Sequence, residues 1–465
     1  MRLADVIDVF IAGDWGNESP SEETPNAVYC VRGADIVPIS IGEFGDIPLR
    51  YVSDKSFEEK TLRAGDMIVE KSGGSPTQST GRVSYVSEAL ITEKRAVVCT
   101  NFCVAFRVKT GWNPYFVYQY WNHIYNNNIF FNFEGKTSGL KNLQLDNALK
   151  AIEIPDYTLE QQNRIAETLL KIEQKVLLNR AINHNLEAMA KQLYDYWFVQ
   201  FDFPDENGKP YKSSGGKMVW DKRLKREIPL LWKAKIVEEV ADVYNGATPS
   251  TVNELNYGGD IVWITPKDLS DQKQKFVYQG ERNISQVGYD SCSTHLLPSN
   301  TILMSSRAPI GLLAIAKTEL CTNQGFKSFV SKSKNIATYL YYYLQYHITQ
   351  IEQLGTGTTF KEVSREDILK FPMLKPSDNV LDLWEEIVSA LNDRQLEIQK
   401  ENENLTKQRD ELLPLLMNGQ VSVNYDLAET GFILFCISSA TKVCFQLIKS
   451  IIVNSVLIIA FYINP

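Results

Sequence analysis

The side chains that could do chemistry in this chain do not form a familiar catalytic motif. Gly135-Lys136-Thr137 has the end of a P-loop, but Phe130 stands where the motif requires its first glycine, so the phosphate cradle is missing. Neither the Gly-x-Ser-x-Gly motif of hydrolases nor the His-Glu-x-x-His motif of metalloproteases occurs. We therefore predict that the chain itself is not an enzyme.

Cysteine and histidine also form no metal-binding pattern. The seven cysteines include no C-x-x-C pair, and the four histidines are scattered. We predict no metal site. An odd cysteine count without a signal peptide favours a reducing, cytoplasmic location.

Two polar loops carry side chains suited to nucleic acid. The loop 71–78, with nearby Arg82, and the loop 305–311 each follow a short apolar stretch. Arg, Gln and Asn read base edges, whereas Ser, Lys and backbone amides hold phosphates. Each residue could instead belong to an ordinary solvated loop. The predicted DNA-contacting residues are Lys71, Ser72, Gly73, Thr77, Gln78, Arg82, Lys141, Lys267, Ser305, Ser306, Arg307, Asn323 and Lys361.

The two loops occupy matching places in an internal repeat. Cys99-Thr100-Asn101 recurs at 321–323, and the segment 138–143 matches 358–363. The segments 35–40 and 260–265 also resemble each other. The offset drifts from 225 to 219 along the chain, which indicates insertions and deletions in the loops of a duplicated module.

Each module reads as mixed α/β. The apolar stretches 66–69 and 301–304 predict strands, and the aromatic segments 115–125 and 339–346 predict buried helices. Glycine loops follow at 135–139 and 355–357. After these loops, the sequence of each module predicts a short helix and then a strand, which ends at Pro155 in the first module and at Pro372 in the second.

A long amphipathic helix is predicted after each module. Apolar residues recur every 3.5 positions through 159–197 and again 219 residues later, which is the pattern of helices that pack together. We predict that the two helices pair with each other, although separate packing on unrelated cores is the alternative. The predicted seam residues are Ile165, Leu169, Ile172, Asn183, Leu186, Leu193, Leu391, Ile398, Asn402, Leu405 and Leu412.

These elements predict six segments: module 1 at 1–157, helix 158–200, linker 201–232, module 2 at 233–376, helix 377–421 and tail 422–465. The linker has Asn207-Gly208 and Ser-Ser-Gly-Gly turns, and we expect turns there rather than a core. The tail is strongly apolar and has no counterpart after the first helix. It is interpreted as an appended or read-through segment, an unplaced strand or a membrane segment.

Charge excludes a polybasic nucleic-acid binder. The formal net charge is −8, and residues 1–157 carry more acidic than basic groups. Phosphate contacts must therefore come from local patches.

The helices and linker contain a series of distinctive segments: 160–166, 185–190, 197–199, 201–203, 207–211, 213–216, 226–229 with Trp232, and 412–421. In these segments the chain resembles the specificity (S) subunit of type I restriction–modification systems. The resemblance covers residues 1 to about 424, is strong in the helices and linker, and is weak inside the modules. The apolar tail departs from the family.

The resemblance implies a mixed α/β protein with two target-recognition domains separated by two long antiparallel coiled-coil helices. Each domain would bind one half of a split double-stranded DNA site. The helices and linker would dock two methyltransferase (M) subunits, which methylate adenine with S-adenosylmethionine, and two restriction (R) subunits would use ATP and Mg. The chain itself would bind no cofactor and have no catalytic residue.

Two alternatives remain open. One is a methyltransferase or nuclease whose motif is not recognisable: Asn113-Pro114-Tyr115-Phe116 faintly resembles the Asn-Pro-Pro-Tyr loop of amino-methyltransferases, but it lacks the second proline. The other is a coiled-coil scaffold that does not contact DNA. The loop-rich modules argue against the scaffold, and a methyl-transfer assay on the chain alone tests the enzyme.

Overall fold

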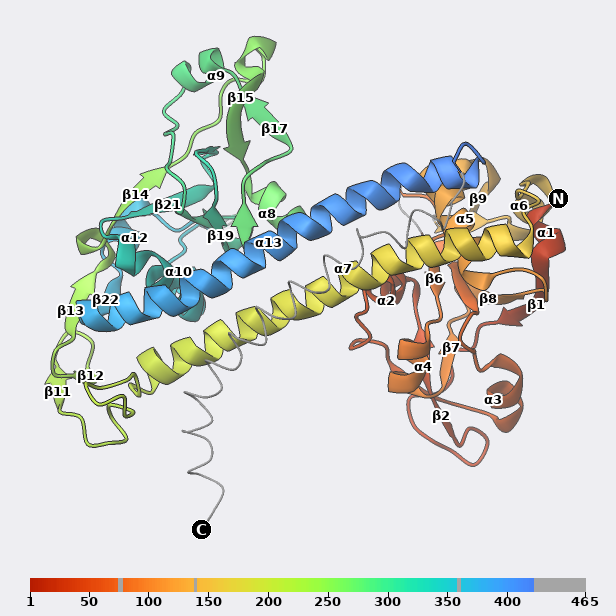
Figure 1. The fold of residues 1–465 in the computed structure, drawn as a ribbon, viewed down its shortest axis with the longest axis horizontal. Coiled ribbons are helices and arrows are strands. Elements are labelled where there is room, and N and C mark those ends of the chain that lie inside the picture. The colour runs from red at the N-terminus through yellow and green to blue at the C-terminus, as the bar shows by residue number, and fades with distance from the viewer. Residues whose placement is uncertain (74–77, 138–139, 358–360, 422–465) are drawn as a thin grey trace. The chain divides into compact units, whose positions relative to one another are not determined.

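The computed structural model describes residues 1–73, 78–137, 140–357 and 361–421 (Figure 1). These residues form two compact units. One contains Met1–Leu178 and the described residues from Glu403 onward, and the other is Asn179–Asn402. Each unit contains one α/β module and segments of two long helices, α7 (Leu159–Tyr194) and α13 (Asp378–Met417). The predicted mixed α/β class with two repeated modules and two long helices is confirmed.

The first module contains three sheets. The largest has the strand order β1-β8-β4-β6, and its central strands bury apolar side chains. The second has the order β3-β2-β7, in which β2 and β7 are parallel, and the third is β5-β10-β9. The strands are β1 (Ile7–Ala12), β2 (Asn26–Val31), β3 (Leu49–Val52), β4 (Met67–Glu70), β5 (Ser72–Gly73), β6 (Val83–Tyr85), β7 (Val97–Cys99), β8 (Cys103–Val108), β9 (Glu134–Thr137) and β10 (Leu140–Leu143).

An aromatic helix closes the core of this module. Helix α5 (Pro114–Asn126) begins where the Asn113 side chain accepts a hydrogen bond from the Phe116 amide, with Pro114 in its first turn. It buries Phe116 and Trp121 completely. The other helices are α1 (Leu3–Val6), α2 (Ile36–Ser40), α3 (Asp54–Lys60), α4 (Glu88–Lys94) and α6 (Leu145–Ala151).

The second module repeats this arrangement. Its main sheet has the order β14-β21-β18-β19-β16, and β18 occupies the place of β4. The sheet β17-β15-β20 again contains a parallel pair, β15 with β20. The strands are β13 (Lys233–Ile236), β14 (Ala241–Asn245), β15 (Tyr257–Ile264), β16 (Phe276–Val277), β17 (Arg282–Ile284), β18 (Ile302–Ser306), β19 (Ile310–Ala316), β20 (Cys321–Thr322), β21 (Phe326–Ser331) and β22 (Pro372–Lys375).

The helices of the second module are short, and α10 buries four tyrosines. Tyr339 and Tyr342 are each at most 2% exposed. The helices are α8 (Pro266–Gln272), α9 (Gln286–Asp290), α10 (Ala337–Tyr346), α11 (Ile348–Gln353) and α12 (Arg365–Leu369).

The parallel strand pair corrects one predicted match of the repeat. Residues 36–40 form helix α2, whereas 257–264 form strand β15, so the resemblance between 35–40 and 260–265 does not mark equivalent elements. The structural counterpart of β15 is β2. Val31 of β2 pairs with Cys99, and Trp263 of β15 pairs with Cys321, which agrees with the Cys-Thr-Asn match.

Two further predictions about the modules are wrong in detail. Residues 134–137, predicted within a glycine loop, form strand β9 of a hairpin with β10. Strand β22 begins at Pro372 instead of ending there, and its partner is β13.

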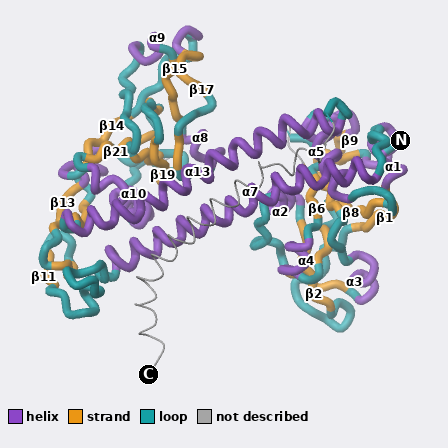
Figure 2. The backbone as a smooth tube through the Cα atoms, viewed as in Figure 1, coloured by secondary structure: helices purple, strands orange, loops and turns teal. Residues whose placement is uncertain are grey.

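Helices α7 and α13 lie side by side within each unit (Figure 2), and their contacts show that they run antiparallel. In the first unit, the Tyr157 hydroxyl just before α7 donates to the carbonyl of Leu416 near the end of α13. In the second unit, Asn179 contacts Asn402, and Asn183, one turn further along α7, contacts Gln395. Rising residue numbers in α7 therefore meet falling numbers in α13.

The segment after α7 is part of a core, contrary to the prediction. Strands β11 (Met218–Asp221) and β12 (Arg226–Pro229) form a hairpin. Phe201, Phe203 and Trp232 are at most 5% exposed and join the hydrophobic cluster of the second unit. Turn residues dominate the composition of the segment, but its aromatic side chains determine how it packs.

The described part of the chain contains no helix that combines the length and apolar character needed to cross a membrane. The predicted tail 422–465 lies outside the described residues.

Candidate nucleic-acid interface

In the first module, the predicted polar loop is tied to the β9–β10 hairpin. Ser72 and Gly73 form β5, which pairs with Asn142 and Lys141 of β10. The Ser72 hydroxyl also donates to the Asn142 side chain. The structure therefore brings Ser72, Gly73 and Lys141 together from sequence positions about 70 residues apart.

Lys141 is held in place by several contacts. Its Nζ lies 3.1 Å from Glu134 Oε2, donates to the Gln78 carbonyl at 3.2 Å and lies 4.6 Å from the centre of the Phe131 ring. Burial alone would raise the pKa of Glu134, but hydrogen bonds from the Thr80 amide and from Lys141 outweigh this effect and lower it. Glu134 therefore stays ionised and anchors the base of the loop.

Lys71 and Gln78 are exposed at this loop, whereas Arg82 is engaged internally. Arg82 forms a bidentate ion pair with Glu70, at 2.6 Å from Nη2 and 2.8 Å from Nε, and the Glu70 carboxylate is almost fully buried. The hydrogen bond to Glu70 raises the pKa of Arg82. Arg82 is a predicted DNA-contacting residue, but the structure commits its guanidinium to Glu70 and thus to the architecture of the loop.

Two glycines allow the backbone to approach this ion pair. A Cβ atom at Gly73, where φ is 150°, would lie 2.6 Å from Glu70 Oε1, and one at Gly33 would lie 2.7 Å from it. Any larger residue at either position would collide with the buried carboxylate. Thr77, another predicted contact residue, lies outside the described residues.

In the second module, two of the predicted contact residues are fully buried. Ser305 and Ser306 end strand β18 and have no exposed surface. The Ser305 hydroxyl donates to the Pro309 carbonyl at 2.7 Å and accepts from the Leu312 amide at 2.8 Å, and thus closes the loop internally. The prediction that these serines contact DNA is wrong, because the strand extends further than its apolar residues indicate.

Arg307 has a partner that the sequence did not reveal. Its Nη1 lies 3.8 Å from Glu362 Oε2, and the other oxygen of Glu362 lies 3.2 Å from Lys327 Nζ. Arg307 keeps 38% of its side-chain surface exposed, whereas Lys327 keeps 6%. Lys327 therefore neutralises much of the Glu362 charge, and the Arg307 guanidinium remains available at the surface. Lys361, next to Glu362, is exposed.

The remaining predicted residues of the second module lie on other elements. Lys267 of α8 is 65% exposed and pairs with Glu281 at 2.8 Å. Asn323 is half-buried, and its side chain accepts from the Gly325 amide at 2.9 Å. The side-chain oxygen of Asn323 therefore stabilises a turn.

Exposed aromatic residues are not among the predicted contact residues, although one adjoins the first predicted loop. Phe102 is 58% exposed, and its carbonyl accepts from the amides of Lys71 and Ser72 at 2.9 and 3.0 Å, so it adjoins the predicted loop. With Trp15 and Asn101 it borders a hollow of about 490 Å³. Aromatic faces stack on bases or wedge between them. The recurring Cys-Thr-Asn motif directly before Phe102 was the one signal in the sequence.

The predicted seam residues of the helices are all buried or half-buried. Asn179, which is buried, donates to Glu401 Oε2 at 2.8 Å and to Asn402 Oδ1 at 3.0 Å. Of the predicted seam residues, those that are buried are Ile165, Leu169, Leu186, Leu391 and Ile398, and those that are half-buried are Ile172, Asn183, Leu193, Asn402, Leu405 and Leu412. In the described ranges, no cluster of three or more His, Cys, Asp or Glu side chains could hold a metal ion.

The sequence model of the type I restriction modification DNA specificity domain matches this chain twice, over residues 1–188 and 229–407. The chain belongs to this family. The two matches coincide with the two structurally repeated modules and their helices. The prediction of a specificity subunit, rather than an enzyme, agrees with this family.

Curated relatives of this specificity-domain chain are specificity subunits. The type I restriction enzyme MjaIX specificity subunit of Methanocaldococcus jannaschii is 35% identical over 197 residues, which cover 41% of this chain and 46% of that protein. The HindI specificity subunit of Haemophilus influenzae is 25% identical over 320 residues, 58% of this chain and 69% of that protein. The match to MjaIX thus spans less than half of that subunit's length.

A solved structure shares the fold. The type I restriction–modification system S subunit from M. genitalium superposes with a TM-score of 0.55 at 14% identity, over 90% of this chain and 95% of that chain. The arrangement of two α/β modules and two long helices is therefore a fold already observed in an S subunit.

Proposed function

We propose that this chain is the DNA-specificity subunit of a type I restriction–modification complex, in which each module binds one half of a bipartite double-stranded site. The observation that carries the proposal is the double match to a DNA specificity domain, which coincides with two repeated modules that differ in their loops. Two repeated DNA-binding modules with different loops suit a DNA site whose two halves differ in sequence.

The exposed groups of each module suit a duplex. The first module offers Lys71, Gln78 and the ring of Phe102, and the second offers Arg307 and Lys361. Lysines attract phosphates, and Arg or Gln can read base edges. The net charge of −8 agrees with a subunit that works inside a complex, where its partners supply much of the nonspecific phosphate attraction.

The partners follow from the same proposal. The paired helices and the hairpin segment dock two methyltransferase subunits, which use S-adenosylmethionine, and two restriction subunits with ATP and Mg complete the complex in the cytoplasm. This chain binds no cofactor. Trp220 in the hairpin is 63% exposed and Leu231 just after it is 72% exposed, and these apolar side chains support a docking role for that segment.

The test is an exchange of modules. Residues 233–376 are replaced by the matching module of a related chain, and DNA methylation is mapped in cells that carry or lack the gene. We expect one half of the methylated sequence to change and the other to stay. A change in both halves would contradict independent reading. Methyl transfer by the purified chain alone would favour the enzyme alternative.

A further inference from the structure

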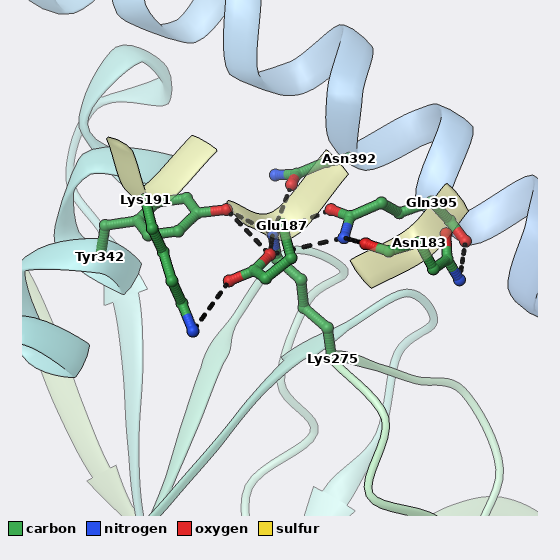
Figure 3. Close-up of polar contacts among 7 residues, drawn as sticks. All are labelled: Asn183, Glu187, Lys191, Lys275, Tyr342, Asn392 and Gln395. Atoms are coloured by element: carbon green, nitrogen blue, oxygen red, sulfur yellow. Dashed lines mark hydrogen bonds and ion pairs between the residues drawn. The ribbon is translucent and has the colours of Figure 1, made fainter. Parts of the chain in front are cut away.

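One lysine of the second module ends between the long helices. Lys275, directly before β16, is 11% exposed, and its Nζ reaches three different helices (Figure 3). Figure 3 shows the acceptors converging on this nitrogen from α7, α10 and α13. The acceptors are Glu187 Oε2 at 2.8 Å, the Tyr342 hydroxyl at 2.7 Å, Asn392 Oδ1 at 2.7 Å and Gln395 Oε1 at 3.1 Å.

These contacts use the full donor capacity of the ammonium group. An ammonium has three N–H donors and no acceptor, and four oxygens surround this one. The rings of Tyr341, Tyr342 and Phe276 lie 4.8 to 5.6 Å from the nitrogen and add cation–π attraction. Because Glu187 lies on α7 and Asn392 and Gln395 lie on α13, Nζ joins the module to both long helices.

Glu187 of α7 is the centre of this cluster. Besides Lys275, its Oε2 accepts from the Tyr342 hydroxyl at 3.1 Å and from Gln395 Nε2 at 3.4 Å. Its Oε1 lies 3.8 Å from Lys191 Nζ. The carboxylate therefore joins both helices and the module, and lies between two lysines.

The energetics favour a role in geometry over a role in stability. Desolvating two charges costs about as much as their attraction returns, so a well-packed apolar group often replaces a buried ion pair without loss of stability. The cluster lies against the apolar core of the second unit, where Val388 and Leu391 are buried. A methionine at 275 would suit this core, but it would not select one orientation of the module.

We propose that Lys275 is a positioning residue that fixes the second module in one orientation on the paired helices, and thereby restricts the spacer lengths that the chain accepts between its two half-sites. This inference rests on the proposed function and adds the residue that sets the selectivity for spacer length. It predicts that Lys275 affects the orientation of the second module on the helices and does not affect which bases are recognised.

The charge of the cluster gives a second readout. Burial lowers the pKa of Lys275 to about 8. Glu187 acts in the opposite direction and raises this pKa, whereas repulsion by Lys191 and Lys317 lowers it further. The titratable and polar groups that face Lys275 are Glu187 and Lys191 of α7, Tyr341 and Tyr342 of α10, Asn392 and Gln395 of α13, and Lys317 directly after β19. Burial raises the pKa of both tyrosines, so they stay neutral and do not titrate in this range.

Selectivity and stability should therefore respond to pH in opposite directions. The folded pKa of Lys275 lies below its ordinary value of 10.5, so the unfolded chain binds more protons between pH of about 8 and 10.5. The free energy of unfolding rises with pH across that window. The three-donor ammonium is lost on passing pH of about 8, so spacer selectivity should fall as stability rises.

The experiment uses the full chain in complex with its methyltransferase subunits. Lys275→Met is compared with wild type and with Glu187→Gln/Lys275→Met, which leaves no unpaired buried carboxylate. The control is Lys332→Met, because Lys332 contacts Glu238 and Asp242 of its own module. Methyl-transfer rates are measured on duplexes that keep both half-sites and have the native spacer, or one base pair more or fewer.

We expect both Lys275 variants to lose about tenfold in the ratio of rates on native and altered spacers, which corresponds to about 1.4 kcal/mol. The bases preferred in each half-site, the thermal unfolding of the double variant and the ratio in the control should stay as in wild type. The wild-type ratio should fall between pH 7 and 9, and the double variant should show no such fall.

Two results would overturn the inference. An unchanged spacer ratio in the double variant would show that Lys275 does not position the module. Altered base preference would make it a recognition residue. If the wild-type complex directs no sequence-specific methylation at all, the proposed function fails. This failure is distinguishable from failure of the inference on Lys275, because it is seen in the wild-type complex without any variant.

Discussion

Lengthening both long helices should lengthen the spacer between the half-sites. We propose inserting four residues after Leu178 in α7 and four after Asn402 in α13, where the chain passes between its two compact units. Because Asn179 bonds to Asn402, these positions face each other, and paired insertions keep every other seam contact in register. An insertion after Leu193 would instead displace Trp197 from the core of the second unit.

The magnitude follows from helix geometry. Four residues add about 6 Å at 1.5 Å each, and rotate the following segment by about 400°, or 40° beyond a full turn. DNA rises about 3.4 Å per base pair, so about 6 Å corresponds to about two base pairs. With about 10–10.5 base pairs in each helical turn, two base pairs rotate by about 70°. The residual mismatch of about 30° is small. Seven residues would add about three base pairs but rotate by about −20°, against about 105° in the DNA.

The assay is methylation mapping of both insertion variants. We expect the four-residue variant to methylate the same half-sites across a spacer about two base pairs longer, and the seven-residue variant to be much less active because its modules face the wrong side of the duplex. Full activity of the four-residue variant on the original spacer would refute the reasoning, since the helices would then not set the spacing. Equal activity of both variants on lengthened spacers would refute the rotational argument.

Three further predictions concern single sites. Arg307→Ala should weaken specific binding by about 1–3 kcal/mol if the guanidinium reads a base, whereas Glu362→Gln should not weaken it; equal affinity of the alanine variant would assign Arg307 to its ion pair with Glu362. Phe102→Ala should weaken DNA binding by about 1–3 kcal/mol if the ring stacks on a base, and Phe102→Tyr should retain it; binding competition on duplexes measures both. Stopping the chain at Asn424 should raise solubility and leave complex formation intact, because the removed segment is largely apolar; loss of methyltransferase-subunit binding in a pull-down would contradict this.

The sequence by itself determined the repeated architecture and the family. A helix that packs on another helix needs apolar residues every 3.5 positions, and this information is local, so the helix predicted at 158–200 corresponds to Leu159–Tyr194 in the structure. The strands predicted at 66–69 and 301–304 correspond to β4 and β18 for a similar reason, because strands that are buried on both faces are largely apolar.

Only the tertiary structure decided which polar residues face solvent. Ser305 at the end of β18 and Arg307 just after it are two positions apart, yet Ser305 is buried with its hydroxyl hydrogen-bonded, and Arg307 keeps 38% of its side-chain surface exposed. Arg82 has a suitable type for base reading, but Glu70 holds it. Composition cannot distinguish such residues, because a polar side chain is exposed or satisfied internally according to partners that the fold supplies.

The same limit applies to the contacts between distant segments. Lys275 binds residues 67 to 120 positions away in the chain, and no periodicity connects it with Glu187, Tyr342 or Gln395. The parallel pairing of β2 with β7, which identified the true counterpart of β15, likewise joins segments about 70 residues apart. Patterns along a sequence record which face of an element is buried, whereas the choice of partner is made when the elements pack.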